Sequence, residues 1–213
     1  LYLLFVPYPK EKKQANLKVK KSGSVRLRSP QWRFSLMLAV IAGIIICFNS
    51  IISLRVPDII VDAHMGTATT AGTVLSLMQL TGIVAGVGFA SLTHVFKKNL
   101  LMIMCFGFGL ALALIGLSGQ LWSLVLGTLL AGFTYSTGVT SIFYHLSEKI
   151  PTNLLNLATS LVLIGCNLGS ALSSFFIQLV TPLAPSNHLL FVWIGALMVG
   201  TGVFASQLLA RTK

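Results

Sequence analysis

Six long apolar segments follow one another along the chain, separated by short stretches rich in proline, charged or amide residues. We place the segments at residues 34–54, 70–92, 99–118, 121–145, 154–180 and 188–209. Each has about 20 residues or more, the length that a helix needs to cross about 30 Å of hydrocarbon. Only a helix satisfies its backbone groups within one segment in lipid. The pattern therefore predicts an all-α polytopic membrane protein with six transmembrane helices.

The stretches between the segments contain residues that interrupt helices. After the first segment comes "RVPDIIVDAHMGTATTAG", which carries Pro57, Asp58 and Asp62. Pro151 follows the fourth segment, and a stretch with two prolines follows the fifth. Proline lacks a backbone donor and clashes with the preceding helical turn. These stretches are therefore predicted to be loops.

Composition agrees with a chain whose surface faces lipid. Hydrophobic residues make up 55% of the 213 residues and charged residues only 9%, whereas soluble domains carry about 25% charged residues. The sequence contains no HExxH, no GxSxG and no glycine-rich phosphate loop with lysine. Its four histidines lie on different loops or helix ends, not at metal-ligand spacing. We expect no enzymatic activity, no metal and no cofactor.

The charges are gathered in one region. Nine lysine and arginine residues lie between Lys10 and Arg33, against Glu11 alone. They lack the interleaved aromatic residues of a base-stacking surface, so no nucleic-acid partner is expected. With six spans, fourteen of the fifteen cations fall on one side of the membrane and Arg55 falls on the other. Because basic loops stay in the cytoplasm, we predict a multi-pass protein of the plasma membrane with both ends of the bundle cytoplasmic.

The remaining segments complete the predicted organisation. Residues 1–7 include "LYLLFV", which is too short to span a bilayer and resembles the end of a helix whose beginning is missing. We therefore expect the chain to be a fragment of a longer protein. Residues 8–33 are predicted to form a basic cytoplasmic loop, residues 34–210 the six-helix bundle, and residues 211–213 a cytoplasmic end.

An internal repeat is visible in two of the spans. "LSLMQLTGIVAG" from Leu75 and "LVLIGCNLGSAL" from Leu161 both place an amide, Gln79 or Asn167, a few residues before a glycine. The two spans run in opposite directions through the membrane. This arrangement fits an inverted repeat of three helices plus three.

The layout resembles the C-terminal half of a major facilitator superfamily transporter. The chain is similar to the end of helix six, a long basic central loop, and helices seven to twelve. The most local resemblance is "GFASLTHVFKKNLLM", where Lys97 and Lys98 match the basic pair of the family's Gly-x-Leu-x-Asp-x-x-Gly-Arg-Lys loop. The acid of that pattern falls on Thr93 and its second glycine on Phe96. The resemblance implies a missing N-terminal six-helix half as a partner, and a central cavity lined by the first, second, fourth and fifth spans.

Polar residues inside the spans are the candidates for a substrate cavity. They are Asn49, Gln79, Tyr135 and Asn167. Transporter sites cluster near the bilayer midplane, but amides also bridge helices through structural hydrogen bonds. None of the four acids lies in a span centre. A carboxylate that couples transport to protons is therefore expected in the missing half, and His145 is interpreted as an interfacial histidine.

Glycines recur at helical spacing in three spans. Gly82 and Gly86, and Gly165 and Gly169, form two GxxxG patterns, and Gly132 lies in the fourth span. Small residues four apart let helix backbones approach closely. The patterns predict close helix packing, or faces that meet the other half, with Gly132 permitting bending.

Two function classes remain open. The first is a secondary active transporter of the major facilitator type that moves a small solute by alternating access, with proton coupling. Amides, tyrosine and aliphatic residues favour a neutral or lipophilic, drug-like solute. The alternative is a self-standing six-helix membrane channel or scaffold subunit that acts as an oligomer.

Overall fold

The computed structural model describes residues 29–96, 99–180, 182 and 186–211, and every regular element in these ranges is a helix. The six α-helices are α1 Ser29–Asp62, α2 Ala68–Phe96, α3 Leu100–Gly116, α4 Leu121–Lys149, α5 Thr152–Val180 and α6 Asn187–Arg211. The prediction of an all-α, six-helix chain is confirmed. Residues 1–28, which hold the predicted end of a helix and most of the basic loop, lie outside the described residues, as do Lys97 and Lys98.

Five of the six helices are long and apolar enough to cross a membrane by themselves. The exception is α3, which has 17 residues and is apolar throughout. At 1.5 Å per residue it is about 26 Å long, at the lower limit for a span. It packs between α4 and α6, which are both longer.

Helix α1 continues past the predicted boundary at residue 54. It runs through Pro57 and Asp58 and ends at Asp62, so the first eight of the 18 residues in the predicted loop are helical. Ile59 and Ile60 are 8% and 0% exposed. The buried side of the helix therefore extends beyond Pro57, and packing outweighs the helix hydrogen bond that proline cannot donate.

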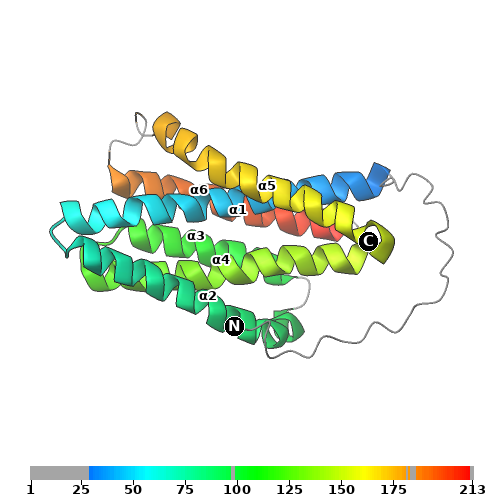
Figure 1. Cartoon of the computed structure of the whole chain (residues 1–213), viewed down its shortest axis with the longest axis horizontal. Coiled ribbons are helices and arrows are strands. Elements are labelled where there is room, and N and C mark those ends of the chain that lie inside the picture. The colour runs from blue at the N-terminus through cyan, green and yellow to red at the C-terminus, as the bar shows by residue number, and fades with distance from the viewer. Residues whose placement is uncertain (1–28, 97–98, 181, 183–185, 212–213) are drawn as a thin grey trace, which may run out of the picture.

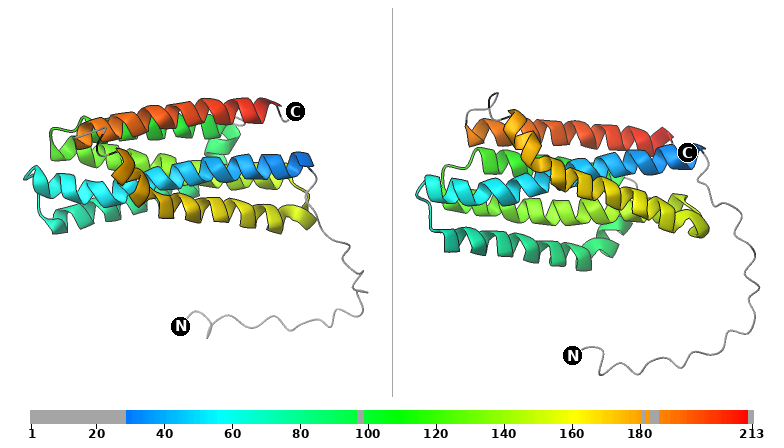
Figure 2. Two further views of the ribbon diagram at one scale, coloured as in Figure 1. Left: turned by 90° about the horizontal axis from the view of Figure 1, so that it is seen from above. Right: turned by 45° about the horizontal axis from the view of Figure 1, so that its top comes forward.

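The six helices lie side by side with their axes roughly along one direction (Figure 1 and Figure 2). The main pairings are α1 with α5, α2 with α4, and α3 with both α4 and α6. The first two pairings correspond to each other when α1–α3 are exchanged for α4–α6. The arrangement is a six-helix bundle built as a three-plus-three repeat, with α1 and α4 in the middle.

The connections are short, so successive helices alternate in direction (Figure 1). One end of the bundle gathers the start of α1 and the ends of α2, α4 and α6. We call it the Arg33 end, because that exposed arginine lies one turn inside α1. The opposite end carries Arg55, Asp58 and Asp62, and we call it the Arg55 end. The ion pair there joins Arg55 to Asp58 at 3.9 Å.

Hydroxyl side chains are concentrated on the central helix α4. Five buried or partly buried ones donate hydrogen bonds to carbonyls three or four residues earlier in the same helix, at 2.7–3.2 Å: Thr128, Thr134, Thr137, Thr140 and Ser141. This is how serine and threonine satisfy their donors inside a helix. These polar groups therefore lie in the bundle without needing a partner on another helix.

Candidate functional site

Asn49 and Tyr135 lie in the centre of the bundle at about the same depth. Helices α1 and α4 run antiparallel, and a Cβ added at Gly138 of α4 would lie 4.0 Å from Ile45 Cδ1 of α1. One turn further along α1 comes Asn49, and one turn back along α4 comes Tyr135. The Tyr135 ring packs on Phe108 of α3, with 6.4 Å between the ring centroids.

The side chain of Asn49 has an unused acceptor. Its Oδ1 atom is buried and has no hydrogen-bond partner among the described residues. An unsatisfied buried polar group costs about 1–3 kcal/mol, so such an oxygen needs a donor from water, a ligand or another chain. Asn49 therefore has a buried carbonyl to offer at mid-bundle.

Asn167 belongs to a longer row of polar residues on α5. Its Nδ2 donates to the carbonyl of Leu163 at 2.9 Å. The row follows one side of the helix at spacings of three, four or seven residues, and all its members are exposed. We call it the α5 polar stripe; it consists of Asn153, Asn156, Ser160, Asn167, Ser170, Ser174 and Gln178.

The neighbouring flank of α5 is apolar. Ile164, Leu168 and Leu172 are 55%, 56% and 54% exposed. They line a groove between α1, α5 and α6, which we call the α1–α5–α6 groove. One flank of α5 therefore suits hydrocarbon and the other does not.

The α5 polar stripe cannot lie against lipid along its whole length. Hydrocarbon offers no partner to an amide or hydroxyl, so polar residues in membrane helices face the bundle interior, another helix or a water-filled cavity. Ser170 Oγ does find a partner, Ser50 Oγ of α1, at 3.3 Å. The rest of the stripe faces away from the described bundle.

Gln79 occupies the equivalent position on α2. Laying the buried side of α2 on that of α5, with Val74 on Val162 and Met78 on Cys166, places Gln79 on Asn167. The same alignment defines the α2 small-residue stripe: Gly72, Gln79, Gly82, Gly86 and Ala90. The four predicted cavity residues thus form two pairs, a central pair on α1 and α4 and an outer pair on α5 and α2. The described chain does not bring all four into one enclosed pocket.

Comparison with known sequences identifies the family. The chain matches the Major Facilitator Superfamily over residues 1–174, which is most of its length. The chain belongs to the major facilitator superfamily. No curated protein matches it. As a member of this transporter family, the chain is a multi-pass membrane protein that acts in transport, which fits the prediction of a non-enzyme.

In this major facilitator chain, the glycines of α5 press against α1. A Cβ at Gly165 would collide with the Ala39 backbone, and one at Gly169 with the Gly43 backbone. Both glycines therefore set the close approach of α5 to α1 within the described bundle. This is the packing use of a GxxxG pattern.

The glycines of α2 and α4 divide between packed and open positions. A Cβ at Gly132 would collide with the carbonyl oxygen of Met78, so this α4 glycine also sets a helix contact. Gly82 is looser: its Cβ would lie 3.5 Å from Ser136 Cβ, and Ser136 Oγ donates to the Gly82 carbonyl at 3.1 Å. Gly86 has nothing within 4 Å and lies on the open face of α2.

His145 lies one turn before the end of α4 and is covered by neighbouring residues. It is 4% exposed, its Nδ1 lies 3.6 Å from Glu148 Oε2, and its Nε2 has no partner among the described residues. The next helical position, Lys149, places its Nζ 5.2 Å from the centre of the Phe34 ring. The Arg33 ends of α1 and α4 are therefore joined through aromatic and charged side chains.

Most of the α5 polar stripe was not singled out from the sequence, which pointed only to Asn167. The signal that could have found it is the helical spacing of the asparagine, serine and glutamine residues within 154–180. No group of three or more histidine, cysteine or acidic residues close enough to hold a metal occurs in the described ranges.

Proposed function

We propose that this major facilitator protein moves a small uncharged solute along a pathway whose wall is the α5 polar stripe, with Asn49 and Tyr135 at its centre. The observation that carries the proposal is the stripe itself. It lies beside an apolar flank on the same helix and is exposed from one end of the span to the other. A stripe of this kind is suited to a water-filled cavity and unsuited to lipid.

The chemistry of the wall supports a neutral or lipophilic, drug-like solute. The groups offered are amides, hydroxyls, one phenol and aliphatic side chains. The described acids lie in the last turns of α1 and α4, away from the middle of the spans. Such a wall can hydrogen-bond a neutral solute and pack on its apolar parts, but it offers no counter-charge to an ion. We propose that transport is proton-coupled and that the titrating carboxylate comes from a second half.

That second half is the proposed partner. Apart from the contacts of Gly82 with Ser136 and of Ser170 with Ser50, the α2 small-residue stripe and the α5 polar stripe face away from the described helices. An N-terminal six-helix bundle lying over both would enclose Asn49 and Tyr135 between the halves. Alternating access would then be the rocking of two bundles about this site.

The proposed orientation places the Arg33 end in the cytoplasm of the cell. Arg33, Lys149 and Arg211 belong to this end. Arg55 and two aspartates lie at the other end. Basic loops are retained in the cytoplasm, which supports a plasma-membrane protein with both ends of the bundle inside.

Cysteine labelling tests the pathway without knowledge of the solute. Asn167→Cys and Ser174→Cys are introduced into the transporter in native membranes, and a water-soluble maleimide is added. The matched controls are Ile164→Cys and Leu172→Cys, on the apolar flank of the same helix at similar exposure. The three native cysteines are buried and give a low background.

The expected result is at least tenfold faster labelling of the two stripe positions than of the two flank positions. Equal labelling on both flanks would show that α5 has no water-facing side, and absence of labelling at the stripe would show that it is a dry contact surface. Either result contradicts the proposed pathway. Protection of Asn167→Cys by a neutral lipophilic solute, but not by charged analogues, would support the proposed solute class.

A further inference from the structure

The α1–α5–α6 groove breaks the symmetry of the repeat. When α1–α3 are superposed on α4–α6, and the reverse, the contact between α3 and α4 corresponds to the contact between α6 and α1. The first contact is tight: a Cβ at Gly127 of α4 would lie 3.1 Å from the backbone nitrogen of Ile115 on α3. Helices α1 and α6 touch only slightly. Between them lies a cavity of about 540 Å³.

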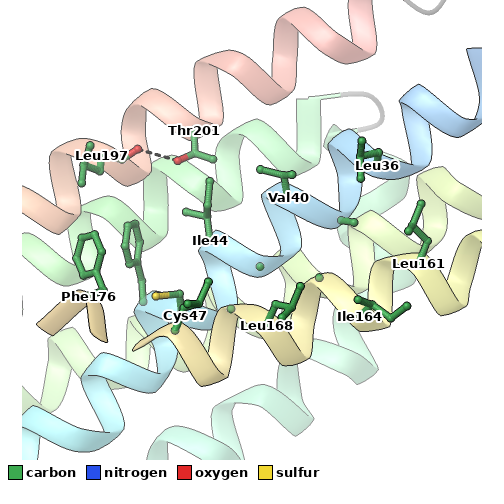
Figure 3. A pocket seen from close by; sticks show the side chains of 16 residues that line it. Leu36, Val40, Ile44, Cys47, Leu161, Ile164, Leu168, Phe176, Leu197 and Thr201 are labelled. Carbon is green, nitrogen blue, oxygen red and sulfur yellow. Dashed lines mark hydrogen bonds between the residues drawn. The ribbon is translucent and has the colours of Figure 1, made fainter. Parts of the chain in front are cut away.

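The wall of the groove is apolar. Val40 and Ile44 of α1 point into it from one side and Ile164 and Leu168 of α5 from another (Figure 3). The single hydroxyl on the wall, that of Thr201, donates to the Leu197 carbonyl of its own helix at 2.7 Å. The groove therefore presents hydrocarbon and offers no polar group to an occupant.

The groove has the depth of one leaflet. Its α1 side runs from Leu36 to Phe48, which is about 18 Å of helix at 1.5 Å per residue. Half of a bilayer's hydrocarbon is about 15 Å. A straight acyl chain lying parallel to α1 would match this length.

A positively charged residue, Arg33, precedes the groove-lining part of α1. Arg33 lies one turn before Leu36 on α1, is exposed, and forms no ion pair with any acid in the described ranges. Trp32 beside it is 45% exposed. Arginine binds phosphate through a planar fork of donors, and tryptophan is enriched at the level of lipid headgroups.

We propose that the α1–α5–α6 groove is a binding site for one anionic phospholipid from the leaflet at the Arg33 end. One acyl chain fills the groove and the headgroup phosphate pairs with Arg33. Apolar wall, leaflet-deep length and a single arginine at the headgroup level are the three features that select this occupant. A helix of another chain would need no cation there.

The first test counts retained lipid by native mass spectrometry. The full chain is delipidated, titrated with dioleoyl-phosphatidylglycerol and activated until surface lipids leave. One lipid per chain is expected to remain. Ile164→Trp, which fills the groove, is expected to reduce the retained fraction at least fivefold. Leu110→Trp on α3, whose position is 57% exposed and outside the groove, should leave the fraction unchanged.

A second pair of variants tests the proposed contact between the lipid headgroup and Arg33. Arg33→Gln is expected to lower phosphatidylglycerol retention about threefold to tenfold, and Arg55→Gln at the opposite end should not. Unchanged retention in both Ile164→Trp and Arg33→Gln would overturn the proposal. A dimer that dissociates in Ile164→Trp would also overturn it, because a second copy would then cover the groove.

A further experiment uses the chain without substitutions, so that its result does not depend on whether a variant folds. Phosphatidylglycerol with a photoreactive diazirine on its acyl chain is mixed into liposomes that contain the protein. After illumination, adducts should concentrate on the groove sides of α1 and α6, between Leu36 and Cys47 and between Leu197 and Thr201. Adducts spread evenly over the outer faces of α3 and α6 would mean ordinary bilayer contact and would contradict the site.

Discussion

Helices α2 and α5 occupy equivalent places in the repeat and are held in similar ways, yet their open faces differ. Each rests on one central helix through small residues: α5 on α1 through Gly165 and Gly169, and α2 on α4 around Gly132. Beyond that contact the α5 polar stripe carries amides and hydroxyls. The α2 small-residue stripe carries glycine and alanine, with Gln79 as its one polar side chain.

The difference separates packing from chemistry. Because both helices are anchored by close small-residue contacts, the requirement to pack cannot explain why the α5 polar stripe carries amides and hydroxyls while the α2 small-residue stripe carries mainly glycine and alanine. The polar groups of α5 contribute little to holding the described bundle, apart from the Ser50–Ser170 contact. We infer that solute contacts fall mainly on α5, and that α2 provides a smooth surface for close approach of another helix.

The largest expected effect concerns the feature that the two helices share. Gly169→Leu would drive a side chain into the Gly43 backbone, which cannot move aside cheaply. We expect destabilisation at or beyond the ~1–3 kcal/mol typical of overpacking, and loss of the monodisperse peak in size-exclusion chromatography of the chain in detergent. Gly86→Leu on α2, where space is open, should elute normally. Similar behaviour of the two variants would refute the packing described for α5.

The next effect tests the polar difference directly. Asn167→Leu removes an amide from the α5 polar stripe and should slow transport of a neutral lipophilic dye about tenfold in proteoliposomes. This corresponds to ~1.4 kcal/mol in the activation free energy of transport. Gln79→Leu, at the equivalent place on α2, should slow it about twofold or less. Expression and thermal stability of both variants serve as controls. A larger loss with Gln79→Leu would assign the solute to α2 instead.

Smaller effects are expected from the hydroxyls at the two interfaces. Ser136→Ala removes the hydrogen bond to the Gly82 carbonyl, and Ser170→Ala removes the contact with Ser50. Each should cost about 0.6 kcal/mol, the average for hydrogen bonds between membrane helices. The loss of unfolding free energy in the double variant should equal the sum of the two single losses, because the two sites are separate. Thermal unfolding in detergent measures all three, and a strong non-additive term would indicate coupling across the bundle.

The smallest effect comes from making α2 resemble α5. Gly72→Ser and Gly86→Ser place hydroxyls at the positions equivalent to Ser160 and Ser174. Both glycines have nothing within 4 Å of an added Cβ, so the change in unfolding free energy should stay within about 0.5 kcal/mol. A loss of several times that size would mean that the bare face of α2 is required for folding of the described bundle.

The helices were predictable because a membrane requires a long apolar segment for each span and leaves the helix as the backbone conformation that satisfies its own hydrogen bonds. Six segments and their alternation followed from apolar runs alone. The end of α1 was not predictable, because Pro57 and Asp58 resemble a loop locally. Burial of Ile59 and Ile60, which depends on the other helices, carries the helix through them.

The site was predictable only in part. Amides in apolar spans identified Asn49, Gln79 and Asn167, but the sequence alone did not show whether each faces a neighbour or the open side. Asn49 lies inside, with a side-chain oxygen that has no hydrogen-bond partner in the part of the chain that the structure describes. Gln79 and Asn167 lie on outer faces. The burial of His145 was missed for the same reason. A position near a helix end does not reveal that neighbouring helices cover the ring.

The hydroxyls of α4 have a mechanical consequence. A threonine that donates to its own helix takes its hydrogen bond with it when the helix moves. Sliding or tilting of α4 against α1 and α3 therefore breaks no bond made by Thr134, Thr137 or Ser141, and exposes no unpaired donor on the way. Resistance to such a shift of α4 then comes from side-chain shape and not from hydrogen bonds of these three residues to neighbouring helices.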